Sequence, residues 1–112
     1  MNGKFELRES SNGQFYFNLR AGNGEVVLTG EMYLAKASAE KGLASVRVNA
    51  PLDAQFERKT SPLREPYFVL KAANGEIIGR SEMYSSPAAR EGGIASVQGH
   101  APGAVLADLT GG

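Results

Sequence analysis

The chain has 112 residues, and its 12 basic and 12 acidic residues give a formal net charge of zero at pH 7. A neutral chain has no overall field that would draw it to nucleic acid or to an anionic membrane surface. The absence of cysteine excludes disulfides, thiolate nucleophiles and thiolate metal sites, and it fits a reducing compartment. No leader-like segment opens the sequence, and no run approaches the ~20 apolar residues that span a bilayer, so we expect a cytoplasmic protein.

The first part of the chain is predicted to be an antiparallel meander of three strands. Asn12-Gly13 and Asn23-Gly24 lie close to or between strand-like runs, and Asn-Gly suits the two-residue type I′ hairpin turn. With the second pair as the turn, Leu19 lies opposite Leu28. This register predicts an inward apolar face made of Phe15, Phe17, Leu19, Ala21, Val26, Leu28 and Met32.

A helix is predicted to follow the meander, starting near Lys36 without a polar cap. Leu43 and Val46 provide an apolar stripe with which this helix can pack on the sheet. The helix is expected to stop at Ala50-Pro51, because the residue before a proline avoids the helical region. An extended segment is predicted over residues 54–60.

The second half of the chain repeats the first at an offset of 51 residues. Residues 67–102 match residues 16–51 at 18 of 36 positions without a gap. Asn74-Gly75 marks the second hairpin, Ser86 and Pro87 suit the N-cap and first position of a second helix, and residues 104–109 are again extended. The predicted inward face of this copy consists of Phe68, Leu70, Ala72, Ile77 and Met83.

These elements predict an α+β fold of seven strands and two helices. Two β-β-β-α-β repeats are expected to form one pseudo-twofold, largely antiparallel sheet with both helices on one face. Because each copy is only about 50 residues, a size at which a lone core is marginal, the two copies are expected to share one core. We therefore predict a single domain over residues 1–112, with repeat one at about 4–53 and repeat two at about 54–110. This fused pseudo-dimer is expected to act as a monomer.

The repeated unit also resembles a known family. Asn-Gly-Glu in the hairpin, Glu-Met-Tyr at the end of the third strand and Gly-(Leu/Ile)-Ala-Ser-Val in the helix occur in both copies. In these features the chain resembles the YegP-like family of small, tandem-repeat bacterial proteins of unknown function. The resemblance implies a fold in which two repeats merge into one sheet with exchanged C-terminal strands. It implies no activity and no catalytic residues.

Three residues of the predicted helices need an explanation. Gly42 and Gly93 are both in mid-helix, where glycine is less favourable than alanine by about 1 kcal/mol, so we expect a close approach there to the sheet or to the other helix. His100 is the only histidine of the chain. We interpret it as a helix end-cap favoured as the imidazolium, because a lone histidine without cysteine offers neither a catalytic triad nor a transition-metal cage.

No recognised catalytic motif occurs. The sequence lacks a G-x-S-x-G elbow, a Walker-type phosphate loop and a dinucleotide-binding glycine pattern in a strand-to-helix setting. We predict no catalytic, cofactor-binding or metal-binding residues, no cofactor and no enzymatic activity. One remote alternative is an enzyme that uses Glu31 and Glu82, which occupy equivalent positions and could form a carboxylate pair.

The outward face of the predicted sheet is the one candidate binding surface. It combines aromatic rings with cationic side chains, a set that suits a protein or peptide interface and, as an alternative, weak binding of single-stranded nucleic acid. Glu31 and Glu82 share this face, and with the neutral net charge they weaken the nucleic-acid alternative. The candidate binding residues are Tyr16, Arg20, Tyr33, Tyr67, Lys71, Arg80 and Tyr84.

Overall fold

The computed structural model describes residues 3–111, which form two α-helices, one short 3-10 turn and seven strands. The predicted number of helices and strands is confirmed. The elements of the first repeat are β1 (Lys4–Glu9), β2 (Phe15–Arg20), β3 (Val26–Thr29) and α1 (Lys36–Asn49). The remaining elements are η1 (Asp53–Gln55), β4 (Phe56–Thr60), β5 (Pro66–Lys71), β6 (Ile77–Arg80), α2 (Pro87–His100) and β7 (Val105–Asp108).

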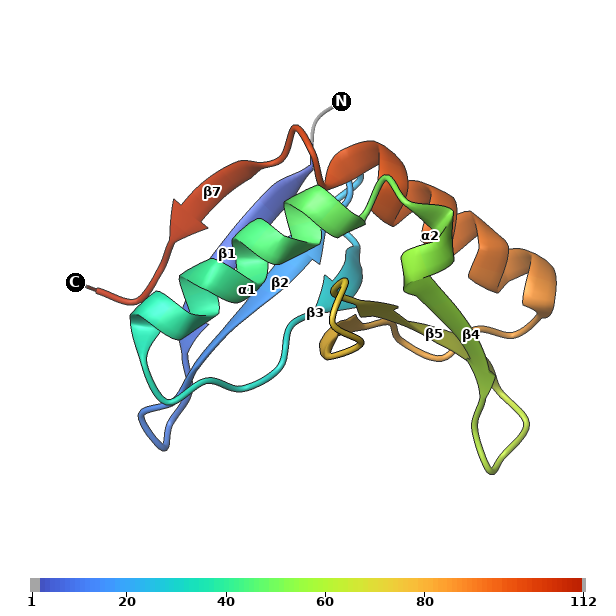
Figure 1. The fold of residues 1–112 in the computed structure, drawn as a ribbon, viewed down its shortest axis with the longest axis horizontal. Helices are drawn as coiled ribbons and strands as arrows, with labels where there is room; N and C mark the ends of the chain where they lie inside the picture. The colour runs from blue at the N-terminus through green and yellow to red at the C-terminus, as the bar shows by residue number, and fades with distance from the viewer. Residues whose placement is uncertain (1–2, 112) are drawn as a thin grey trace.

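All seven strands belong to one sheet with the order β4-β5-β6-β3-β2-β1-β7 (Figure 1). The two repeats meet where β3 pairs with β6, and the paired residues there are Thr29 and Arg80. These two residues are 51 positions apart, which is the offset of the sequence repeat. The predicted pseudo-twofold axis therefore passes through this pairing.

The strands that follow the two helices have different positions. β4 follows α1 and pairs with β5, antiparallel, so it is the counterpart of β1 in the second repeat. β7 follows α2 and crosses to the first repeat, where it pairs in parallel with β1. The Val105 N–H donates to the Gly3 carbonyl at 3.2 Å, and the Leu109 N–H donates to the Leu7 carbonyl at 2.8 Å. β7 thus covers one edge of the sheet, and β4 is the other edge.

One hydrophobic core joins the two repeats. Its residues come from strands and helices of both repeats, and Phe5, Phe17 and Phe68 are fully buried in it. α1 contacts β5 and β6 as well as β1 and β2, while α2 contacts β3 as well as β5. Each helix therefore packs across the repeat junction, on the same side of the sheet. Neither helix of the described chain is long and apolar enough to cross a membrane.

The predicted register is wrong at two places in each copy, because the β2–β3 and β5–β6 hairpins contain irregularities that shift the pairing by one residue. The first shift lies between Leu19 and Arg20. Because of it, the Val27 side chain points into the core, where it is 8% exposed, and takes the place predicted for Val26. Beyond Gly30 the pairing shifts again, so Phe15 lies opposite Tyr33 and not Met32. A shift by one residue moves a side chain to the other face of a sheet. In the second copy, Ile78 and Tyr84 likewise take the inward positions predicted for Ile77 and Met83.

The helix starts agree with the prediction. The Ser86 hydroxyl accepts a hydrogen bond from the Ala89 N–H at 3.0 Å, and Pro87 is the first residue of α2. Ala35 at the start of α1 provides no side-chain cap. The Lys36 ammonium instead pairs with the Asp108 carboxylate of β7 at 2.6 Å, and this pairing, with hydrogen bonds from Thr110, lowers the pKa of Asp108.

His100 is a structural residue, but it is not the charged helix cap that we predicted. Its Nε2 accepts a hydrogen bond from the Gly22 N–H at 3.3 Å, so this nitrogen carries no proton. The proton is then on Nδ1, which donates to the Ser96 carbonyl at 2.8 Å. The imidazole connects the end of α2 to the β2–β3 turn of the first repeat.

The two mid-helix glycines lie against tyrosine rings, which confirms the predicted close approach. A Cβ built at Gly42 would lie 2.8 Å from Cζ of Tyr33, and one at Gly93 would lie 2.6 Å from Cζ of Tyr84. Both distances are too short for carbon atoms in contact. The rings of these two tyrosines thus require a residue without a side chain on the facing helix.

We predict that Gly93→Ala destabilises the protein by about 1–3 kcal/mol, because overpacking at the Tyr84 ring outweighs the gain in helix propensity. The adjacent Gly92 is the matched control, since nothing lies within 4 Å of a Cβ built there. Gly92→Ala is expected to stabilise α2 by up to about 1 kcal/mol. Urea unfolding followed by circular dichroism measures both changes, and equal effects of the two substitutions would contradict this account.

Candidate functional site

The predicted binding residues do not all lie on one face. Tyr16 and Arg20 on β2 alternate with the buried Phe17 and Leu19, so they point away from the helices. In the second repeat, three further residues share this outer face, and they are Tyr67, Lys71 and Arg80. Five of the seven predicted residues are thus on the outer face.

Tyr33 and Tyr84 are on the opposite side, against the helices, and their assignment to the outer face is wrong. Both rings pack on the hydrophobic core, and the Tyr84 ring stacks on Phe68 with centroids 6.2 Å apart. Their hydroxyls approach the backbone of the facing helix at Gly42 and Gly93. The register shift after Gly30 and its counterpart after Ser81 account for the reversal.

Arg20 is engaged in an ion cluster around Glu6. The Glu6 side chain, 8% exposed, accepts hydrogen bonds from Arg20 Nε at 2.6 Å and from Arg8 Nη2 at 3.2 Å, and Lys4 lies 3.6 Å away. These hydrogen bonds, that of Arg20 first, lower the pKa of Glu6 below its ordinary range although burial opposes the shift. Arg20 also donates to the Gly24 carbonyl at 2.8 Å, which ties the β2–β3 turn to the cluster.

The second repeat has a matching cluster around Glu57. Lys71 and Lys59 occupy the positions of Arg20 and Arg8, and their ammonium groups lie 2.5 Å and 3.5 Å from the Glu57 carboxylate. The hydrogen bond from Lys71 is the main cause of the lowered pKa of Glu57. The charges of Arg20 and Lys71 are thus already paired with carboxylates of the same face.

A groove opens at the repeat junction, beside the Thr29–Arg80 pairing. After this pairing both segments become irregular but stay bonded to the sheet: the Gly30 N–H donates to the Phe17 carbonyl at 2.8 Å, and the Ser81 hydroxyl accepts a hydrogen bond from the Phe68 N–H at 2.9 Å. The groove has a volume of about 470 Å³. Its lining comes from both repeats and consists of Val26, Leu28, Thr29, Gly30, Glu31, Met32, Arg80, Ser81 and Glu82.

The surroundings of this junction groove are acidic. Glu31 and Glu82 line it together, and Arg80 is the one cation in its lining. The carboxylates of Glu31 and Glu76 also raise the pKa of Tyr33, after the larger effect of burial, and Glu82 and Glu25 do the same for Tyr84. Each tyrosine therefore lies within the field of carboxylates from both repeats.

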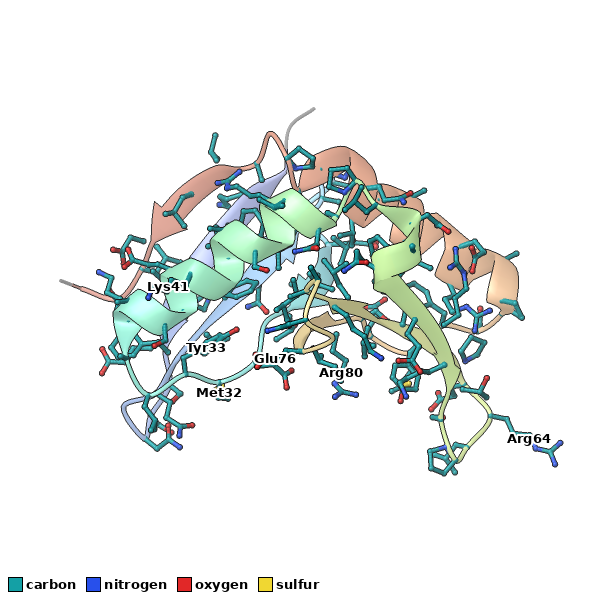
Figure 2. All side chains as sticks on the ribbon, viewed as in Figure 1. Met32, Tyr33, Lys41, Arg64, Glu76 and Arg80 are labelled. Atoms are coloured by element: carbon teal, nitrogen blue, oxygen red, sulfur yellow. The ribbon has the colours of Figure 1, made fainter. Side chains whose placement is uncertain are left out.

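Apolar atoms form much of the groove wall. Val26 contributes an aliphatic side chain, and Met32 adds a flexible thioether that is 48% exposed. Figure 2 shows Met32, Glu76 and Arg80 on the side of the molecule away from the helices. An apolar wall with carboxylates at its margin can hold an extended segment that carries apolar and basic side chains.

The groove brings together the two carboxylates that we considered as a remote catalytic pair. Among residues 3–111, however, no group of three or more histidine, aspartate or glutamate side chains could hold a metal ion. The raised pKa values near the groove belong to Tyr33 and Tyr84, whose rings pack against the helices. A raised phenol pKa keeps the hydroxyl protonated at neutral pH, so neither tyrosine supplies a base.

Sequence reasoning identified Arg80 but missed the groove itself. Met32 was expected in the core, and Val26 was expected to point inward, whereas both line the groove. A signal was present in Gly30, because a glycine at the end of a strand often marks a bulge or a close packing contact. The register shift that exposes Met32 could not be derived from the alternating pattern alone.

Comparison with known proteins identifies the family. The family described as "Domain of unknown function (DUF1508)" matches residues 10–57 and 64–108, and the chain therefore belongs to it. The UPF0339 protein YegP of Yersinia pestis is 53% identical over 108 residues, which cover 96% of each chain. The YegP-like resemblance is thus confirmed, and these names specify no activity.

Two solution NMR structures have the same fold. That of a UPF0339 protein from Shewanella oneidensis has a TM-score of 0.92 and 50% identity, over 98% of this chain and 93% of that chain. That of yegP from E. coli, described as a protein of unknown function, has a TM-score of 0.94 and 52% identity, over 100% and 97% of the two chains. The fold of this chain is therefore that of its relatives over nearly the whole length.

We predict that Glu6→Gln lowers the free energy of unfolding at pH 7 by about 1–2 kcal/mol, because three cations lose their nearly buried partner. The lowered pKa means that Glu6 stabilises the fold above the ordinary carboxyl range and loses this effect as the pH falls through its folded pKa. The difference between wild type and variant should therefore shrink towards pH 3.

Urea unfolding at pH 7 and pH 3 measures this difference. Glu9→Gln is the matched control, because Glu9 is an exposed glutamate on the same strand. The control should change stability by less than about 0.5 kcal/mol. An equal effect of Glu6→Gln at both pH values would refute the assigned role of the cluster.

Proposed function

We propose that this member of the DUF1508 family is a non-enzymatic protein-interaction module that binds an extended, basic peptide segment in the junction groove. The observation that carries the proposal is the composition of the groove, in which carboxylates from both repeats flank an apolar wall. The groove spans the pseudo-twofold axis, so a bound segment would contact both repeats. Duplication of the unit is thus what forms the proposed site.

The apolar part of the groove supports a peptide ligand. Met32 in the groove is 48% exposed, although methionine is usually among the more buried residue types, and its counterpart Met83, outside the groove lining, is 43% exposed. Unbranched, polarizable methionine side chains adapt to different apolar partners and are common on surfaces that bind peptides. An apolar side chain of the ligand would cover Met32 and lie against Val26.

The charges of the groove support a basic ligand. Glu31 and Glu82 line the groove together with one cation, Arg80, and Glu76 and Glu25 lie near enough to help raise the pKa of Tyr33 and Tyr84. Complementary charge speeds association and selects among partners. Arg80 would bind a carbonyl or carboxylate group of the peptide and so fix its position.

The alternative of single-stranded nucleic acid has less support. Two of the cations considered for it, Arg20 and Lys71, are paired with Glu6 and Glu57. Two of the four tyrosines considered as stacking platforms, Tyr33 and Tyr84, pack against the helices. The carboxylates of the groove would repel phosphate groups.

The module would act in the cytoplasm as a single chain. Peptide recognition without catalysis would take place in the cytoplasm, which fits the absence of cysteine. The active form would be one chain, a fused pseudo-dimer with its repeats at about 4–53 and 54–110. No cofactor is required.

Selection from a displayed peptide library with the purified protein is the direct test. We expect enrichment of peptides that combine lysine or arginine with a large apolar residue. Titration of a selected peptide into Glu31→Gln/Glu82→Gln should show a roughly tenfold weaker Kd, together with a smaller dependence on salt. Met32→Ala should weaken binding about fivefold through lost apolar contact, with the salt dependence unchanged.

Glu40→Gln is the matched control, because Glu40 is an exposed glutamate on α1, remote from the groove lining. The Kd of the Glu40→Gln variant for the selected peptide should equal that of the wild type. Enrichment of acidic peptides, or equal binding by all variants, would rule out the groove as the site. Binding of an oligo(dT) probe that weakens steeply with salt would instead favour the nucleic-acid alternative.

A further inference from the structure

The turn between β4 and β5 presents an exposed leucine beside an arginine without a side-chain partner. Leu63 is 82% exposed, and Arg64 is exposed as well. Within residues 3–111 the Arg64 guanidinium forms no hydrogen bond or ion pair, whereas Arg20 and Lys71 are paired with carboxylates. Figure 2 shows Arg64 at the tip of the turn, pointing away from the rest of the molecule. The tip can therefore contact another molecule without breaking an existing interaction.

The backbone of this turn is fixed and strained. The Ser61 N–H donates to the Glu65 carbonyl at 2.9 Å, and the Arg64 N–H donates to the Ser61 carbonyl at 2.8 Å. The ring of Pro62 restricts the turn further. Arg64 has a φ of +64°, in the left-handed region that residues other than glycine, asparagine and aspartate rarely adopt. The two side chains at the tip are thus held in place at a cost in backbone energy.

The first repeat contains the same turn without these two side chains. At the offset of 51 residues, Leu63 and Arg64 correspond to Asn12 and Gly13. The Gly13 N–H donates to the Ser10 carbonyl at 3.0 Å, as in the second repeat, and the φ of Gly13 is +81°. Asparagine and glycine suit such a turn better than leucine and arginine. Formation of the turn therefore does not explain the leucine and the arginine.

The junction groove offers a surface that is complementary to this tip. Its lining contains the half-exposed thioether of Met32 and the carboxylates of Glu31 and Glu82. Its volume of about 470 Å³ lies in the range of pockets that enclose a small ligand, so it has room for two side chains. A leucine beside an arginine thus matches an apolar wall beside two carboxylates.

We propose, on the basis of the function proposed above, that the junction groove also binds the β4–β5 turn of a second copy of this chain. In this contact Leu63 of one copy packs on Met32 of the other. The Arg64 guanidinium pairs with the carboxylate of Glu31 or Glu82. The fixed backbone of the turn lowers the entropy that is lost on binding.

The turn has to come from another copy. It is closed by short-range backbone hydrogen bonds, and in Figure 2 Arg64 lies at one end of the molecule, well away from Met32 and Arg80 of the groove. The turn and the groove are different surfaces, so the contact is heterologous. A chain whose groove is occupied still presents its own turn, and copies can be joined head to tail.

Self-association of this kind regulates access to the groove. A groove that holds the turn of a neighbour is closed to other peptides, so the single chain is the form that binds them. A peptide ligand in turn separates the copies, because it competes for the same groove and shifts the equilibrium by mass action. Peptide binding is therefore strongest in dilute protein.

Two variants of the intact protein test the contact. Leu63→Asn/Arg64→Gly gives the turn the residues of the first repeat, and Glu31→Gln/Glu82→Gln removes the carboxylates of the groove. In sedimentation velocity the mean mass of the wild type should rise with concentration, and each variant alone should associate at least about tenfold more weakly. An equimolar mixture of the two should associate, because one supplies an intact turn and the other an intact groove.

Lys41→Gln/Val48→Gln is the matched control, since it removes an exposed cation and an exposed apolar side chain from α1, outside the groove lining. Its association should equal that of the wild type. The Leu63→Asn/Arg64→Gly variant should bind a library-selected peptide as the wild type does. Its melting temperature should stay within a few degrees of the wild-type value, because the first repeat forms the same turn with these residues.

Three outcomes would overturn the proposal. One is a wild-type mean mass that stays constant up to millimolar protein, another is equal association of Leu63→Asn/Arg64→Gly and wild type, and the third is a mixture of the two variants that does not associate. If a selected peptide still binds the groove, such an outcome refutes self-association alone. If no peptide binds and Glu31→Gln/Glu82→Gln associates like the wild type, both this proposal and the proposed function are refuted.

Discussion

The sheet is narrowest at its centre, where β3 and β6 meet through Thr29 and Arg80. A single residue pair cannot hold the two repeats together, so most of the contact between them comes from the helices. α1 extends over β5 and β6 and α2 over β3, so burial of apolar surface on either helix requires the strands of both repeats. Gly42 and Gly93 permit this packing, since the tyrosine rings below them need the space that a side chain would fill.

The sequence repeat was sufficient to predict the architecture. Strand number, helix positions, the cap at Ser86 and the shared core follow from local patterns that occur twice, and the structure contains all of them. The C-terminal strand shows the limit of this reasoning. The pairing of β7 with β1 is parallel and joins the two ends of the chain, and no local pattern specifies such a partner.

The candidate site was predictable only in part, because a one-residue irregularity reverses what alternation predicts. Val27 and Tyr33 point inward and Met32 points outward for this reason alone. Arg20 and Lys71 were correctly predicted to be cations of the outer face. Their pairing with Glu6 and Glu57 was not predicted, because it depends on distances between neighbouring strands. The groove depends on these irregularities, since residues that follow β3 and β6 line it.

The position of β7 has a consequence for how the chain folds. Residues 105–108 pair with residues 4–7, so the largest part of the sequence lies between the two partners. During synthesis β1 emerges first but keeps an uncovered edge until the ribosome has released the last strand. Contacts of such long sequence separation slow folding and prolong exposure of unpaired strands. The pairing that completes the sheet is therefore the one between β1 and β7, which can form only after the hairpins between them.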